Sequence, residues 1–347
     1  MYISIANKRR KYSKSPRKDY YNYSIDINFY YKGQKFIIII FICIFCFVLF
    51  HNQTKNKSSP SLPTSSVPPL SFYETEESIN FDRYEVDKYN EINQKIIDYK
   101  CSEMAKIHRK FINGIDRKYK PKKILELGVK RGGGSIVILN AINDFNESYL
   151  YSIDINTEEE VGECVNKYFP NLMKNWSLFK GNIAAEYMEK IGNNIDMVII
   201  DTAHYEPGEI LDFLIVLPFL KENAIAVFHD IGDQIHKNSE RNEWAPYKIF
   251  YTIRGVKYFP TGKFSIWQDV GAVKLDSNQS KYYHDYFGLF AGQWQYVPKE
   301  AHINQARDFI KKYYDNDSFN MFEETVSFNR DFVKRFPKPV IYNYIHD

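Results

Sequence analysis

Short apolar runs alternate with stretches of helical periodicity through the middle of the chain. Apolar residues recur at three- and four-residue steps over 84–119, which predicts a helix that ends before Pro121. Later apolar runs predict strands at 123–127, 149–153, 176–180, 196–200, 224–228 and 270–275. The stretches between them predict helices at 135–142, 158–168, 184–191, 207–220 and 246–253. This alternation is typical of an α/β fold, a Rossmann-like, doubly wound and mostly parallel sheet with helices on both faces.

A different pattern occupies the beginning of the chain. Residues 36–50 form an uncharged apolar run, and the leader 1–35 before it contains nine Lys and Arg residues against two Asp. Extended back through the preceding aromatic residues, the run is long enough for a transmembrane anchor, and the basic leader predicts a cytoplasmic N-terminus. We therefore expect a single-pass type II membrane protein with a lumenal or otherwise extracytoplasmic catalytic domain. A buried core helix and a cleaved signal peptide are the alternatives.

Composition divides the rest of the chain. Residues 51–72 are rich in Pro, Ser and Thr, which predicts a semi-extended linker. We expect a helical cap over 73–119, a catalytic domain over 120–280 and an aromatic-rich helical extension over 281–347. The aromatic rings of that extension could stack on a sugar, or they could cover a sheet edge or a dimer interface.

Charge and cysteine content exclude several classes of protein. The net charge is +3, but the leader alone carries +9 − 2 = +7, so the remainder carries +3 − 7 = −4. An acidic body is a poor match for nucleic acid. Of the four cysteines, two lie in the apolar run, which argues against a disulfide scaffold, and Cys101 and Cys164 lack the spacing of a zinc site.

A glycine-rich loop follows the first predicted strand and runs from Glu126 through Gly128 and Gly132 to Ser135. Glycines allow a ligand to approach the backbone closely, and the helix that follows offers free N–H groups. The carboxylate of Glu126 would repel a pyrophosphate and attract a cationic amino acid or a sulfonium. A helix cap or a salt bridge is the structural alternative for Glu126.

Two further polar residues end the next strands. Asp154 ends the second strand, where a carboxylate can accept hydrogen bonds from both ribose hydroxyls. Asn182 follows the third strand, where its amide could bond an adenine edge. Asp154 could equally serve only as a turn residue.

These residues resemble the class I S-adenosylmethionine-dependent methyltransferases. The similar pieces are ILELGVKRGGGS, YSIDIN, FKGN and IDMVIIDTAHYEPGEILDFLIVLPFLKENAIAVFHDI. The last piece resembles the small-molecule O-methyltransferase branch that also contains macrolide-sugar O-methyltransferases and cephalosporin-hydroxylase-like proteins. The resemblance covers about 120–275. It implies that the loop 126–135 binds the methionine part of S-adenosylmethionine, Asp154 the ribose and Asn182 the adenine region. The loop is one residue longer than the common pattern, and many members have an acidic residue where Asn182 stands.

Four polar residues follow the fourth and fifth predicted strands, Asp201 and His204 after one, His229 and Asp230 after the other. These strands are neighbours in such a sheet, so we expect the four side chains to converge. Asp201 and Asp230 could hold a Mg²⁺ ion, which would lower the pKa of an acceptor hydroxyl. His204 is the preferred general base and His229 the second choice. Two more acidic residues are candidates for a third metal ligand, Asp233 and Glu206.

The function expected from these patterns is S-adenosylmethionine-dependent methylation of a hydroxyl on a sugar or related small molecule, by a membrane-tethered enzyme. A small-molecule or glycan acceptor is the expected partner, the membrane is contacted through 36–50, and a homodimer is a further expectation. A non-catalytic S-adenosylmethionine-binding module is the first alternative. A nicotinamide-dependent short-chain reductase is disfavoured, because no tyrosine after the glycine-rich loop has a lysine four residues later.

Overall fold

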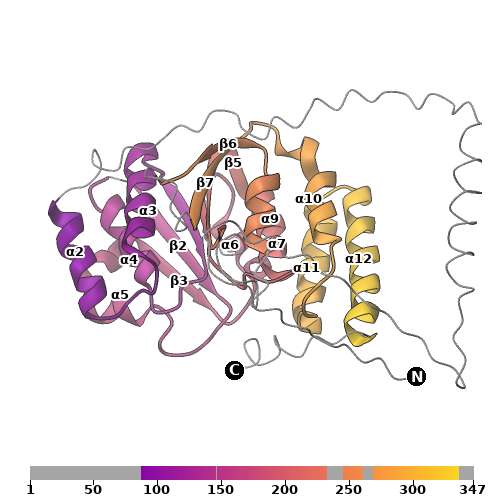
Figure 1. Ribbon diagram of the computed structural model, residues 1–347, viewed down its shortest axis with the longest axis horizontal. Helices are drawn as coiled ribbons and strands as arrows, with labels where there is room; N and C mark the ends of the chain where they lie inside the picture. The colour runs from indigo at the N-terminus through magenta and orange to yellow at the C-terminus, as the bar shows by residue number, and fades with distance from the viewer. Residues whose placement is uncertain (1–86, 146, 233–244, 261–268, 336–347) are drawn as a thin grey trace, which may run out of the picture. The chain divides into compact units, whose positions relative to one another are not determined.

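The computed structural model describes residues 87–145, 147–232, 245–260 and 269–335 (Figure 1). All of them belong to the larger of two compact units, which spans 69–347. The predicted leader, anchor and linker (1–35, 36–50 and 51–72) lie outside the described residues.

The expected single-pass membrane localisation, with an extracytoplasmic catalytic domain, needs correction. Over the described ranges, no helix combines the length and the apolar character needed to cross a membrane. The longest of them, α12 (Asn316–Arg335), has charged residues along its length. This finding contradicts the assignment as a type II membrane protein.

Seven strands form one mixed sheet in the order β3-β2-β1-β4-β5-β7-β6. Their bounds are β1 Lys123–Leu127, β2 Tyr149–Asp154, β3 Trp176–Lys180, β4 Ile195–Ile200, β5 Leu220–His229, β6 Gly255–Tyr258 and β7 Val270–Leu275. Strands β1 to β5 are parallel, whereas β7 runs antiparallel to both β5 and β6. The strand order reverses between β1 and β4, which is where such sheets bind ligands. The predicted Rossmann-like, mostly parallel sheet is confirmed, and β6 is a strand that the periodicity missed.

Helices cover both faces of this sheet (Figure 1). One face carries α2 Asp87–Asp98, α3 Lys106–Tyr119, α4 Gly133–Ile142 and α5 Glu163–Tyr168. The other face carries α6 Met188–Ile191, α7 Gly208–Val216, α9 Ala245–Thr252, α10 Tyr283–Phe290, α11 Glu300–Tyr313 and α12. Short 3₁₀ segments lie at Pro170–Asn175, Ala184–Glu186, Leu217–Phe219 and Gln279–Tyr282. Strand residues alternate between the two cores, as Ile124 and Leu125 of β1 do, because successive side chains of a strand point to opposite faces.

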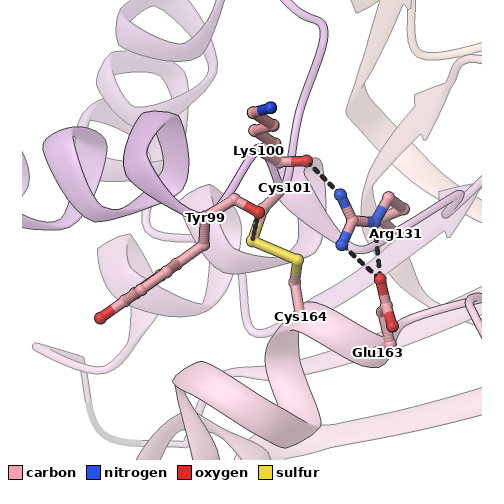
Figure 2. The surroundings of a disulfide bond; sticks show 6 residues. All are labelled: Tyr99, Lys100, Cys101, Arg131, Glu163 and Cys164. Atoms are coloured by element: carbon pink, nitrogen blue, oxygen red, sulfur yellow. Dashed lines mark hydrogen bonds and ion pairs between the residues drawn. A yellow bond between two sulfur atoms is a disulfide. The ribbon is translucent and has the colours of Figure 1, made fainter.

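The helix predicted over 84–119 is interrupted in the structure. Helix α2 ends at Asp98, Lys100 has a left-handed backbone (φ 54°), and α3 begins only at Lys106. The linker between the two helices contains Cys101, which forms a disulfide with Cys164 of α5 (Figure 2). The place of two of the four cysteines in the apolar run argued against a disulfide scaffold, but the fold brings the Cα atoms of Cys101 and Cys164 within 5.8 Å, which is a distance that a disulfide can bridge.

Four aromatic residues of the C-terminal extension belong to the core. Tyr286, Phe287, Phe290 and Trp294 are all buried and share one apolar cluster with strand residues such as Phe228. These four rings therefore cover the sheet, and they are not available to stack on a sugar.

Candidate active site

The glycine-rich loop after β1 lies directly against the loop after β4. The N–H of Gly128 donates to the carbonyl oxygen of Ile153 at 3.0 Å, and the N–H of Asp201 donates to that of Leu127 at 3.0 Å. A Cβ atom at position 128, where φ is +85°, would lie 1.8 Å from the carbonyl oxygen of Asp201. Only glycine allows this approach, which joins the predicted cofactor loop to the predicted catalytic loop.

Asp154 supports the same loop from the end of β2. Its Oδ2 accepts hydrogen bonds from the N–H groups of Val129 (2.9 Å) and Lys130 (3.0 Å), and its Oδ1 accepts one from Asn156 (2.9 Å). The carboxylate is 6% exposed. It lies at the strand end where a ribose is expected, and its role toward a ribose stays a prediction.

Glu126 is buried beneath the first turn of α4 and is only 3% exposed. Its Oε2 accepts hydrogen bonds from the hydroxyls of Ser135 and Ser152, each at 2.6 Å. Burial raises the pKa of this carboxyl to about 7, although the two hydroxyl bonds oppose the rise. The structure therefore pairs two predicted cofactor residues, Glu126 and Ser135, with each other, and their contact with a ligand stays a prediction.

The remaining predicted cofactor residues lie around the same strand ends. Gly132 caps α4 with φ +91°, and a Cβ atom there would lie 2.9 Å from a methyl group of Val165 in the neighbouring α5. Asn182 follows β3, and its Oδ1 accepts a hydrogen bond from the N–H of Ile183 at 2.9 Å.

The four residues predicted for catalysis, Asp201, His204, His229 and Asp230, do come together in what we call the Asp–His cluster. His204 lies between two carboxylates, with Nε2 3.2 Å from Oδ1 of Asp201 and Nδ1 2.8 Å from Oδ2 of Asp230. His229 Nδ1 lies 3.1 Å from the same Asp230 oxygen and 3.7 Å from Asp201 Oδ1. His204 and Asp230 both have positive φ angles, 58° and 56°, a costly conformation that clusters at functional sites.

The two carboxylates determine the protonation of the two histidines. Burial opposes a positive charge on His204, but hydrogen bonds to Asp201 and Asp230 outweigh it and raise its pKa well above the ordinary value. Burial likewise opposes the charge on His229, and the same carboxylates raise its pKa to about 9. Burial works against ionisation of Asp230, yet the neighbouring histidines lower its pKa. Two carboxylates facing one ring therefore favour the imidazolium form of His204, and its role as a general base stays a prediction.

The donor set fits a divalent cation. Asp201, His229 and Asp230 each offer one ligand atom, and these atoms lie within 4.8 Å of one another. His229 Nδ1 is buried and, among the described residues, has ion-pair contacts but no hydrogen bond. Such an atom is suited to ligation, and an imidazole with two carboxylates suits Mn²⁺ as well as Mg²⁺. Of the two other candidates for a third ligand, Asp233 lies outside the described residues and Glu206 pairs with Lys248.

Two further residues contact this cluster, and the sequence pattern did not indicate them. His108 of α3 contacts His229, with its Nδ1 2.9 Å from Nε2 of His229. Glu209, fully buried in α7, accepts a hydrogen bond from the backbone N–H of His204 at 3.1 Å, and burial raises its pKa to about 8. In the sequence, the only sign of a role for His108 or Glu209 was that each is a polar residue among apolar residues on one face of a helix.

Residues 125–231 match a family model described as a methyltransferase domain. The matched range contains the glycine-rich loop, Asp154 and all four residues of the Asp–His cluster. The match supports the predicted class, an S-adenosylmethionine-dependent methyltransferase. It does not test the narrower assignment to the macrolide-sugar or cephalosporin-hydroxylase-like branch. A search of curated proteins gave no match.

Solved structures similar to this chain include three methyltransferases. The O-methyltransferase TomG from Streptomyces achromogenes, involved in tomaymycin synthesis and solved with S-adenosylmethionine, is 15% identical over 55% of this chain and 91% of its own, with a TM-score of 0.41. An O-methyltransferase from Bacillus cereus, in complex with S-adenosylhomocysteine, is 14% identical over 55% and 91%, with a TM-score of 0.40. A methyltransferase from Geobacter sulfurreducens is 16% identical over 55% and 91%, with a TM-score of 0.39.

Proposed function

We propose that this chain transfers the methyl group of S-adenosylmethionine to a hydroxyl of a sugar or related small molecule, assisted by a divalent cation. One observation carries the proposal. The glycine-rich loop and the Asp–His cluster meet at the switch point of the sheet, through the contact between Gly128 and Asp201. A methyl donor held by the loop would therefore lie beside the groups that would bind and deprotonate an acceptor.

The residues around the loop suit a cationic nucleoside. Asp154 presents a carboxylate at the end of β2, and its lone pairs beyond those used by the loop can accept ribose hydroxyls. The N-terminus of α4, capped by Gly132, offers backbone N–H groups to the carboxylate of the methionine part. The carboxylates of Asp201 and Asp230 are the negative groups expected on the side where the sulfonium would lie.

Asp201, Asp230 and His229 would hold the cation, which when bound would lower the pKa of the acceptor hydroxyl and orient its oxygen. The two carboxylates contribute most of this affinity, because they carry the negative charge of the site, are partly buried and present oxygens within 4.8 Å of one another. Removing one of them leaves a site with one carboxylate and an imidazole, which binds divalent cations far more weakly.

His204 is the residue we propose for removing the hydroxyl proton. While both of its ring nitrogens face carboxylates, the ring stays protonated. Once the carboxylate of Asp201 is engaged elsewhere, the pKa of His204 falls and Nε2 becomes an acceptor. The hydrogen bond from the His204 backbone to Glu209 keeps the ring at the same place during this change.

A non-catalytic S-adenosylmethionine-binding module is the second candidate. The observation in its favour is that two histidines, His204 and His229, face the two carboxylates, so their two imidazolium charges balance the cluster without a cation. The sugar acceptor rests on the resemblance of the sequence, since the buried aromatic rings of α10 do not form a sugar platform.

Calorimetry and a transfer assay test the proposal together. S-adenosylmethionine should bind the full chain, and Mn²⁺ or Mg²⁺ should allow methyl transfer to at least one member of a panel of sugars and phenols. Asp230→Asn should lower the transfer rate at least about 100-fold, whereas Asp98→Asn, on the exposed surface of α2, should not. Absence of S-adenosylmethionine binding at millimolar concentration would end the proposal. Binding without transfer to any acceptor would favour the non-catalytic module.

A further inference from the structure

Helix α3, which precedes the matched domain, contributes a side chain to the Asp–His cluster. The ring of His108 meets that of His229 edge to face, with centroids 5.0 Å apart and an interplanar angle of 68°. Nδ1 of His108 lies 2.9 Å from Nε2 of His229, and His108 is only 4% exposed. We infer that His108 is a positioning residue, which holds His229 with Nδ1 directed at Asp201 and Asp230. This inference rests on the proposed function.

The direction of the hydrogen bond between the two rings follows from the surroundings of His229. Its Nδ1 faces the carboxylates, and its Nε2 faces His108. If His229 is protonated, both of its nitrogens carry a hydrogen. If Nδ1 instead ligates a cation, it carries none, and the ring proton is on Nε2. In both of these states Nε2 donates and His108 Nδ1 accepts, and this is the direction that we assign to the bond.

This hydrogen bond does two things for the cluster. With His108 Nδ1 as the acceptor, it favours the tautomer of His229 that carries the proton on Nε2 over the one that carries it on Nδ1, which could not ligate. It also prevents the ring from turning about its Cβ–Cγ bond, since such a turn would leave a buried Nε2–H without an acceptor. His229 is therefore oriented for ligation before any cation arrives, and a cation has only to displace the proton on Nδ1.

The position of α3 does not depend on this contact. Phe111, Ile112 and Ile115 pack the helix into the core beneath the sheet. At the start of the helix, Arg109 donates hydrogen bonds to Oδ1 of Asn93 and to the carbonyl oxygen of Met104. Replacement of His108 should therefore change the orientation of His229 more than it changes the fold.

Two variants separate positioning from packing. His108→Asn keeps an acceptor near the place of Nδ1, whereas His108→Leu keeps volume and removes the acceptor. The affinity of the full chain for Mn²⁺ can be measured by electron paramagnetic resonance in the absence of methyl donor. This affinity should fall about 10- to 100-fold in His108→Leu. The affinity for Mn²⁺ should fall by less than about threefold in His108→Asn. His284→Leu, at an exposed position of α10, is the control and should bind as the wild type does.

A second readout is independent of both cation and catalysis. In ¹⁵N-histidine-labelled full-length protein, correlation spectra should show a proton on His229 Nε2 and none on His108 Nδ1. The opposite assignment would overturn the inference even if His108→Leu failed to fold. Equal Mn²⁺ affinity in wild type and a folded His108→Leu variant would overturn it as well. If the wild type bound no Mn²⁺ but showed the expected tautomers, the positioning role would stand and the proposed cation would fail.

Discussion

The backbone of Gly128 packs directly against the carbonyl oxygen of Asp201, so closely that a Cβ atom at position 128 would lie 1.8 Å from it. Gly128 belongs to the loop predicted to hold the methyl donor, and Asp201 to the cluster predicted to hold the acceptor. The two halves of the proposed reaction are thus coupled through one backbone contact. A change in either loop is transmitted to the other without any intervening side chain.

Gly128→Ala should lower the free energy of unfolding by more than about 3 kcal/mol, because the cost of a left-handed backbone at alanine and the cost of the overlap with Asp201 add up. Urea unfolding followed by circular dichroism measures this. Gly288→Ala is the matched control. Position 288 lies within α10, where an added Cβ meets nothing within 4 Å, so alanine should stabilise by about 0.5–1 kcal/mol. Similar effects at the two positions would contradict the close contact.

Two substitutions of Asp154 should separate its support of the loop from its proposed contact with ribose. Asp154→Asn keeps a side-chain oxygen for the N–H groups of Val129 and Lys130 but loses the charge, so stability should change little. The affinity for S-adenosylmethionine should fall about 10-fold or more, as expected for a lost charge-assisted hydrogen bond. Asp154→Ala should in addition lower the free energy of unfolding by about 1–3 kcal/mol. Undiminished affinity in Asp154→Asn would remove the ribose assignment.

Glu126 should make stability depend on pH. Its pKa is raised from the ordinary 4.5 to about 7, so the folded protein holds a proton that the unfolded chain releases. The stabilisation is fully present below about pH 4.5 and is lost as the pH rises through 7, by up to about 3 kcal/mol. Glu126→Gln should flatten this decline when unfolding is measured at pH 5 and pH 8. An equal slope in both proteins would show that Glu126 is ionised in the folded state.

The same carboxyl tests the predicted charge of the ligand. If the cationic end of S-adenosylmethionine lies near Glu126, binding favours the ionised carboxylate and releases a proton at pH 6. Calorimetry in two buffers of different ionisation enthalpy detects this release. Glu126→Gln should bind without it, and a wild type that also releases none would place the cationic group elsewhere.

Loss of the Cys101–Cys164 disulfide should destabilise the fold. The bond joins cysteines that are 63 residues apart in the sequence. By restricting the unfolded chain, a cross-link of this length is expected to stabilise the fold by about 4 kcal/mol. Arg131 joins the same two segments, because it donates to the carbonyl oxygen of Lys100 and pairs with Glu163 (Figure 2). The double variant Cys101→Ser/Cys164→Ser should unfold at lower urea concentration than the oxidised wild type. Addition of a reductant should shift the wild type toward the variant and leave the variant unchanged.

The amino-acid sequence by itself determined the five parallel strands, the glycine-rich loop and the polar residues at the strand ends. These features depend on local periodicity and on turn chemistry, which are readable over a few residues. Convergence of Asp201, His204, His229 and Asp230 also followed, because neighbouring parallel strands end at one edge of a sheet.

Only the tertiary structure decided the partners of these residues. The disulfide joins cysteines 63 residues apart, and His108 reaches His229 from a helix 121 residues earlier. Such contacts depend on how helices pack on a sheet, which spacing along the chain does not encode. The raised pKa of His204 likewise arises because two carboxylates face one partly buried ring, and electrostatic energy depends on distance and burial rather than on sequence order.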